Sequence, residues 1–243
     1  MTIAQKIEDR INLIADGTVF SIDDLGLPND WWENIRVKLS RMVGKGIVQK
    51  LSKGKFYKPQ KSAFGLLKPS LRETVKDIIY DKDGKTTGYL TGYSIWNDMG
   101  LTTQVASIIM IASNKRRNPT KRGMYSIRFV FQPAAVTKDN IPFLQILDTI
   151  KFIKDIPDTN VAQSVLTLKS LIGNLQKDDV KKLLRLSAKY PPRVKALLGA
   201  ILDNLGYEDI TSDLNDTLNP GTKYKFGLGS THVLLNKEKW NIE

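Results

Sequence analysis

Apolar and polar positions between Pro28 and Pro59 alternate in a way that predicts one helix followed by a short hairpin. Apolar side chains first recur at a helical period and define one buried face, at Trp31, Trp32, Ile35, Leu39, Met42 and Val43. Asn29 is a suitable N-cap for this helix, and the Gly44-Lys45-Gly46 run ends it. Residues 47–51 and 55–57 then alternate like strands around the turn signal Ser52-Lys53-Gly54.

A second, polar stripe runs beside the apolar face of this helix. Its members follow an i, i+4, i+7, i+11 pattern, so they project outward together, whereas Arg36 and Ser40 fall on another side. Helix, strand, basic turn and strand are the second half of a winged helix-turn-helix, in which the helix enters the major groove and the hairpin reaches phosphates. The DNA-binding candidates are therefore Asn34, Lys38, Arg41 and Lys45 on the helix and Lys50, Lys53, Lys55 and Lys58 on the hairpin.

The residues before Pro28 complete that arrangement. Isoleucines at helical spacing predict a helix over residues 2–15, residues 18–20 form a strand-like link, and Ser21 caps a brief helix that Gly26 ends. This order predicts a winged helix domain over residues 1–59. Winged helices also serve as protein-interaction modules, which is the alternative for this domain.

Residues 60–68 lose the periodic apolar pattern and form a basic link. The domain boundary is therefore predicted after residue 59, with a second domain over residues 60–243. Pro69 starts a helix there, and Tyr93 to Met99 suggest a short buried one. The expected strands cover residues 107–112 and 125–131, and the later helices residues 141–156, 161–175, 177–189 and 192–205. The fold class expected is α+β: an N-terminal winged helix-turn-helix followed by a mixed α/β C-terminal domain with several helices. A Gly-rich tail with a possible strand at residues 233–235 should cover that domain through Tyr224, Phe226 and Trp240.

Two further basic clusters lie in the second domain. One is the acid-free loop NKRRNPTKRG between the two strands, and the other is the outer side of the helix over residues 177–189. A possible second basic surface therefore consists of Lys115, Arg116, Arg117, Lys121, Arg122, Lys181, Lys182 and Arg185. A solvated hairpin tip explains the loop equally well.

Charge narrows the class of partner. The formal net charge of +12 and a pI of about 9.7 favour a polyanion, and nucleic acid is the expected one. No apolar run is long enough to span a bilayer and the N-terminus is unlike a signal peptide, so we expect a cytoplasmic protein without a membrane partner.

Catalytic and metal-binding patterns are weak. The chain has no Cys and one His, which excludes thiol chemistry and a histidine-built zinc site. No GxGxxG follows a strand and no GxxxxGK[ST] occurs, and Asp81-Lys82-Asp83-Gly84 lacks the later Glu of a calcium loop. Ser230, Thr231 and His232 are the only nucleophile-plus-His neighbourhood, and adjacent residues seldom form a catalytic pair. We therefore expect no enzyme, no catalytic residues, no metal site and no cofactor.

Four stretches together resemble the AbiEi family, the antitoxins of AbiE-type (type IV) toxin–antitoxin systems. They are DGTVFSIDDL, LSRMVGKGIVQKLSKGKFYKP, TGYLTGYSIWNDMGLTTQV and AKYPPRVKALLGAILDNLG. The resemblance implies a winged helix that binds its own promoter and represses the operon, joined to an α/β domain that neutralises the toxin. It also implies a nucleotidyltransferase-like toxin with which no stable complex forms.

The leading hypothesis is a sequence-specific DNA-binding repressor that acts as such an antitoxin, with two protomers on an inverted-repeat operator. The alternative is a winged-helix RNA- or protein-binding accessory factor with no antitoxin role. RNA recognition normally uses exposed aromatics to stack splayed bases, and most aromatics here fall in buried patterns, which favours duplex DNA. An enzyme acting on nucleic acid would need clustered carboxylates in a basic cleft.

Overall fold

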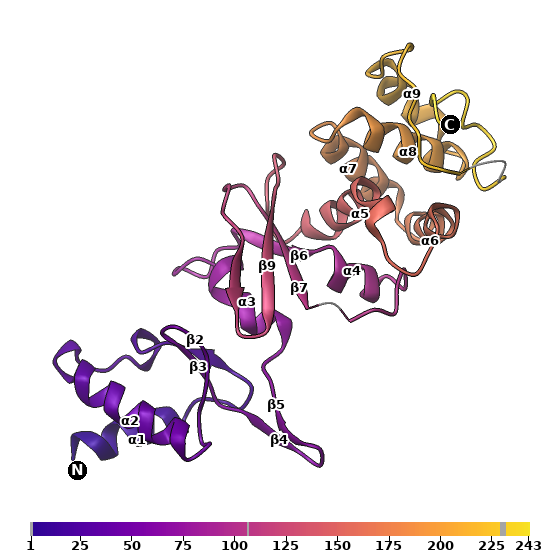
Figure 1. The fold of residues 1–243 in the computed structure, drawn as a ribbon. Helices are drawn as coiled ribbons and strands as arrows, with labels where there is room; N and C mark the ends of the chain where they lie inside the picture. Colours follow the sequence, from indigo (N-terminus) through magenta and orange to yellow (C-terminus); the bar gives the residue numbers. More distant parts are fainter. Residues whose placement is uncertain (1, 106, 229–231) are drawn as a thin grey trace. The chain divides into compact units, whose positions relative to one another are not determined.

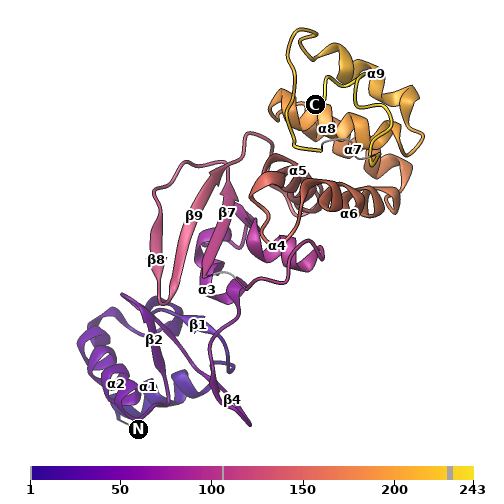
Figure 2. The same ribbon diagram turned by 45° about the vertical axis from the view of Figure 1, so that its right-hand side comes forward.

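A computed structural model describes residues 2–105, 107–228 and 232–243 and shows a mixed α and β fold (Figures 1 and 2). The chain divides into two compact units. Unit 1 contains Met1–Ile78 and Lys121–Tyr125, and unit 2 contains Ile79–Thr120 and Ser126–Glu243. Each unit is described in turn below.

Unit 1 begins with two helices and a small sheet. Its elements are α1 (Ile3–Asn12), β1 (Val19–Phe20), the 3-10 turns η1 (Asp23–Leu25) and η2 (Asn29–Trp31), α2 (Trp32–Gly44), β2 (Gln49–Ser52) and β3 (Lys55–Tyr57). The strands form an antiparallel sheet in the order β1-β3-β2, with Tyr57 opposite both Val19 and Gln49. Gly54 supplies the positive φ, of 71°, that the tight β2–β3 turn requires.

The core of unit 1 confirms most of the predicted apolar face of α2. Ile35, Leu39 and Met42 are buried together with Ile7 and Ile11 of α1, while Phe20, Leu25 and Val48 close the same cluster. The prediction that Trp32 is buried is wrong, because its side chain lies at the first turn of α2 and is 48% exposed. Asn29 lies inside η2 and does not cap α2.

The segment expected to be a linker is instead ordered structure of unit 1. It forms the hairpin β4 (Gln60–Ser62) and β5 (Gly65–Leu67), which projects as a separate arm (Figure 1), followed by α3 (Leu71–Ile79). The units divide after Ile78, later than the boundary predicted after residue 59. The reason is that α3 is tied to the preceding strands: Glu73 accepts a 3.0 Å hydrogen bond from the backbone N–H of Val19.

Unit 2 is built on a sheet with strand order β6-β7-β9-β8. The elements are β6 (Gly88–Thr91), α4 (Tyr93–Asp98), β7 (Ile108–Ser113), β8 (Thr120–Arg122) and β9 (Tyr125–Phe131). The end of β8 and the first residue of β9 fall within Lys121–Tyr125, which belongs to unit 1. Strand β6 is antiparallel to β7, but β7 and β9 are parallel. The basic loop is therefore not the tip of a hairpin between β7 and β9. The chain leaves β7, passes to the outer strand β8, and returns through β9.

Helices follow the sheet: α5 (Ile141–Lys151), the 3-10 turn η3 (Ile153–Asp155), α6 (Val161–Gly173), α7 (Lys177–Ser187), α8 (Pro192–Asp203) and α9 (Glu208–Asp216). The predictions of α6, α7 and α8 are confirmed, with ends a few residues shorter than expected. The helix predicted over residues 141–156 ends earlier, and α9 was not predicted. Helix α8 is the most deeply buried, with Val194, Leu197, Leu198 and Ile201 fully inaccessible.

The C-terminal segment covers the helices of unit 2, as predicted from its aromatic residues. Tyr224, Phe226 and Trp240 are all buried, and a Cβ added at Gly199 would lie 2.1 Å from the Trp240 ring. The indole N–H of Trp240 donates to Asp203 at the end of α8, at 2.9 Å. The possible strand at residues 233–235 is wrong, since no strand forms there. Within the described ranges, no helix is long and apolar enough to cross a membrane.

Candidate nucleic-acid interface

Helix α2 turns one broad polar face to solvent. Its apolar side chains pack in the core with α1, whereas Asn34, Arg41 and Lys45 are exposed. Val37, between Asn34 and Arg41 in the sequence, is 43% exposed. The face therefore offers an amide, two cations and one apolar side chain, a combination suited to reading base edges.

Lys38 belongs to the same predicted stripe but has an internal partner. Its Nζ lies 2.5 Å from Glu8 Oε2 of α1, and the lysine side chain is 21% exposed. The hydrogen bond from Lys38 and its positive charge lower the pKa of Glu8. Lys38 thus links α2 to α1 at the edge of the outward face.

The opposite edge of α2, where the sequence placed Arg36 and Ser40, borders a groove of about 380 Å³. The groove is lined by Glu33, Arg36, Val37, Ser40, Val43, Lys50 and Phe56. The Arg36 guanidinium lies 5.2 Å from the Trp32 ring and 3.2 Å from Glu33. The polar face of α2 is consequently wider than the stripe predicted from sequence.

The four hairpin lysines divide into two pairs. Lys50 and Lys53 are exposed on and beside the β2–β3 turn. Lys55 pairs with Asp77 at 3.4 Å. Lys58 pairs with Asp16 at 3.1 Å and also donates to the carbonyls of Asn12, the last residue of α1, and Ile14. Only Lys50 and Lys53 are therefore placed to meet a ligand without first breaking an internal contact.

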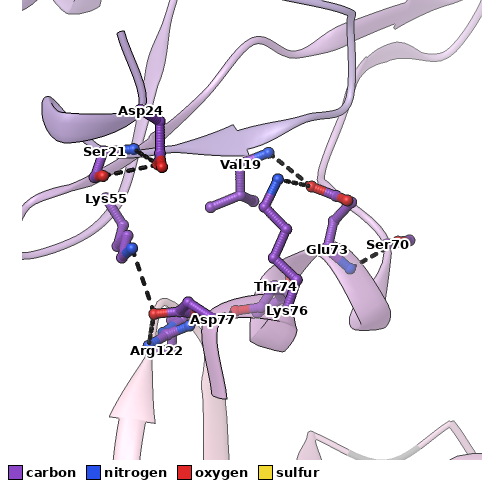
Figure 3. A network of polar contacts seen from close by, with 10 residues as sticks. All are labelled: Val19, Ser21, Asp24, Lys55, Ser70, Glu73, Thr74, Lys76, Asp77 and Arg122. Atoms are coloured by element: carbon purple, nitrogen blue, oxygen red, sulfur yellow. Dashed lines mark hydrogen bonds and ion pairs between the residues drawn. The ribbon is translucent and has the colours of Figure 1, made fainter. Parts of the chain in front are cut away.

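Asp77 of α3 is the centre of a small network within unit 1 (Figure 3). Arg122 donates to both of its carboxylate oxygens, at 2.5 and 3.2 Å, and also to the Thr74 carbonyl at 2.7 Å, while Lys55 approaches from β3. Burial of Asp77 opposes its charged form, but the hydrogen bonds and charges of Arg122 and Lys55 outweigh this and lower its pKa. Arg122 is thus a structural residue.

The other residues of the predicted second basic surface do not form one cluster. Lys121 is exposed on β8, in the part of that strand that belongs to unit 1, whereas Lys115, Arg116 and Arg117 are exposed in unit 2. On α7, Lys181 pairs with Asp178 at 3.3 Å, Lys182 donates to the Asp139 carbonyl at 2.8 Å, and Arg185 is exposed.

Sequence patterns missed a buried polar cluster in unit 2. Asp148 of α5 accepts hydrogen bonds from Tyr89 at 2.7 Å, Thr91 at 3.0 Å and Tyr190 at 2.8 Å, and Gln132 donates to both tyrosine oxygens. Burial raises the pKa of Asp148 despite these three donors, and it also raises the pKa of both tyrosines. The available signal was an aspartate inside the otherwise apolar stretch of α5.

No group of three or more His, Cys, Asp or Glu residues within the described parts of the chain is arranged to hold a metal ion. His232 is exposed, and Ser230 and Thr231 lie outside the described residues.

Comparison with known proteins gives a family and a fold. The model of DUF6088, described as a family of unknown function, matches residues 6–183. The crystal structure of the RV2827C protein from Mycobacterium tuberculosis is similar over 97% of this chain and 88% of that chain, with a TM-score of 0.63 and 13% identity. At that identity the similarity concerns the fold alone. A search of curated proteins finds no match.

Proposed function

The chain belongs to DUF6088, a family of unknown function, and we propose that its unit 1 is a winged helix-turn-helix that binds duplex DNA. The protein then acts as a sequence-specific transcriptional repressor. Helix α2 is the recognition helix, and the β2–β3 hairpin is the wing.

The observation that carries the proposal is the outward face of α2 beside that hairpin. The order α1, β1, α2, β2, β3 with a β1-β3-β2 sheet supports a winged helix, in which the 3-10 turns η1 and η2 take the place of the second helix. The side chains of Arg41, Lys50 and Lys53 are exposed on α2 and the hairpin, and none of them forms an ion pair within the described parts of the chain. Cations that the fold does not neutralise are the groups that a phosphate backbone attracts.

The contacts differ in what each contributes. Asn34 and Arg41 hydrogen-bond base edges in the major groove, and Val37 packs on a thymine methyl group. Lys45, Lys50 and Lys53 bind phosphates and fix the register without reading sequence. Lys38, Lys55 and Lys58 hold α2 and the wing in place through their internal partners and are positioning residues.

Two substitutions test these roles. Arg41→Ala is expected to cost about 1–3 kcal/mol on the preferred duplex and to relax the preference at one base pair. Lys53→Ala is expected to weaken preferred and scrambled duplexes by the same factor and to lower the salt slope by about one unit. Fluorescence anisotropy with both duplexes measures each effect.

Arg72→Ala is the matched control, because it removes an exposed arginine of unit 1 from α3, outside α2 and the wing. It should leave both affinities close to those of the unmodified chain. Equal losses from Arg41→Ala on preferred and scrambled duplexes would contradict the assignment of α2 as the recognition helix.

The resemblance to AbiEi proteins supports a further proposal, that the chain is the antitoxin of a type IV system. A nucleotidyltransferase-like gene from the same operon is expected to arrest growth when expressed alone. Co-expression of this chain should restore growth, while the two proteins elute separately in size-exclusion chromatography. Arrest that persists despite co-expression would refute the antitoxin role and leave the DNA-binding proposal standing.

A further inference from the structure

Unit 2 contains a pocket of about 400 Å³ between the loop that follows β7 and the end of β9. Its lining combines three cations, one amide and two aromatic rings, and no carboxylate: Lys115, Arg116, Arg117, Asn118, Phe129 and Phe131. Such a lining suits a ligand that is both anionic and planar. The proposed DNA interface is in unit 1 and uses none of these residues.

The loop that carries the cations is fixed to the sheet. The Asn114 side-chain amide donates to the backbone carbonyls of Gln132 and Ala134, at 2.5 and 2.7 Å, just beyond β9. The Ser113 hydroxyl donates to the Lys115 carbonyl at 2.8 Å. These bonds hold the start of the loop beside the end of β9.

Each of the two arginines lies over one of the aromatic rings. Phe129 and Phe131 are two residues apart on β9 and therefore share one face of the strand. The Arg116 guanidinium lies 4.7 Å from the Phe131 ring, and that of Arg117 lies 5.7 Å from the Phe129 ring. Phe131 is 41% exposed, unusual for a phenylalanine in a strand. The contacts hold two long side chains over the rings, which reduces the conformational entropy lost when a ligand binds.

We propose that this pocket binds a nucleotide of a single-stranded nucleic acid. The unpaired base stacks on the layer formed by Phe131 and Arg116, and its phosphate is bound by Lys115 and Arg117. Aromatic rings and guanidinium planes are the surfaces on which proteins stack splayed bases, and flanking cations follow the backbone. Bases paired in a duplex cannot reach such a pocket, so the ligand differs from that of α2.

This pocket contains accessible aromatic side chains, which the sequence patterns had not predicted and whose expected absence had favoured duplex DNA over RNA. Nine of the 20 aromatic side chains are buried and most of the others are half-buried, so the predicted burial holds only in part. Phe129 and Phe131 line an open basic pocket, which is the combination that single-strand recognition uses.

The test is anisotropy of the full chain with labelled 12-nucleotide oligouridine and oligothymidine. Phe131→Leu keeps an apolar side chain of similar size but removes the π face, and it should weaken binding roughly tenfold. Arg117→Ala should weaken binding several-fold and lower the log–log salt slope by about 0.7. Thermal melts confirm that each variant is folded.

Arg128→Ala is the matched control. It removes one positive charge from β9, the strand that carries the two phenylalanines, but residue 128 lies on the opposite face of β9 from them. The affinity of the Arg128→Ala variant for the single-stranded oligonucleotides should equal that of the unmodified chain. A loss as large as that of Arg117→Ala would reduce the effect to general charge and overturn the proposal, as would unchanged binding by Phe131→Leu.

Competition identifies the source of the nucleotide. Displacement of the label by uridine monophosphate, at concentrations where inorganic phosphate has no effect, supports a base-plus-phosphate site that free nucleotides also enter. Displacement only by unlabelled oligonucleotide supports a site for single strands alone. Equal displacement by inorganic phosphate would show a simple anion site and overturn base stacking. Failure of these tests leaves duplex binding by unit 1 unaffected, since the duplex assays use different residues.

Discussion

At the scale of single residues, the internal partner of each cation decides its role. Lys38 and Lys53 are equally basic in the sequence, yet Lys38 contacts Glu8 whereas Lys53 is exposed at the turn of the wing. An internal carboxylate competes with phosphate for the same ammonium group. The cations without such partners are therefore the better candidates for DNA contact.

These partners could not be predicted from local sequence. Glu8 lies 30 positions from Lys38, and Asp77 lies 45 positions from Arg122. Periodicity identifies which side chains of a helix share a face, and it identified Ile35, Leu39 and Met42 correctly. It carries no information about which distant acid the fold brings to a given lysine.

Asp77→Asn tests the network that joins Lys55 and Arg122. The substitution leaves both cations without their carboxylate, so the free energy of unfolding at pH 7 should fall by about 1–2 kcal/mol, a figure reduced for partial exposure. Because the pKa of Asp77 is lowered by folding, its contribution is complete above the ordinary carboxyl pKa and is lost as pH falls through the lowered pKa.

Urea unfolding of both proteins between pH 7 and pH 3 measures this difference. Asp83→Asn, at an exposed position in a turn, is the control and should change stability little. A difference between the unmodified chain and Asp77→Asn that grows on acidification would contradict the role of the ion pairs.

At the scale of elements, helices were predicted correctly where Pro or Gly residues mark their ends. Pro192 and Gly206 bracket α8, and the apolar spacing between them specifies a helix. Helix α9 was missed because its sequence, EDITSDLND, is mostly polar and buries only Thr211 and Leu214. The parallel pairing of β7 with β9 could not be predicted from the sequence either, because the relative direction of two strands depends on long-range contacts.

The Asp148 cluster joins four parts of unit 2, because its members come from α5, from β6, from the residue that follows β9 and from the segment that precedes α8. Burial raises the pKa of Asp148 above its unfolded value. The stability that this group contributes is therefore complete below the unfolded pKa and is lost as pH rises through the folded pKa.

Asp148→Asn removes that titration while keeping an amide of similar shape. The stability of the unmodified chain relative to the variant should fall as pH rises, by up to about 1.4 kcal/mol per pH unit within the titration range. Urea unfolding from pH 4 to pH 8 measures the trend, with Asp139→Asn at an exposed site as the control. A relative stability that rises with pH would show that Asp148 is stabilised as the carboxylate.

At the scale of the whole molecule, the net charge of +12 is distributed over two units that offer different chemistry. In unit 1, exposed cations lie on a helix and a hairpin, and the proposed duplex recognition rests on them. In unit 2, cations lie over aromatic rings, and the proposed single-strand site rests on them. Composition predicted a polyanionic partner, but only the fold separates these two surfaces.

The most direct test of the central proposal is the binding of the full chain to DNA from upstream of its own gene. A scrambled duplex of the same composition is the reference, and salt is varied for both. We predict tighter binding to the upstream duplex, with a log–log salt slope that corresponds to about 4–8 phosphates. Equal, weak binding to both duplexes at every salt concentration would contradict a sequence-specific repressor.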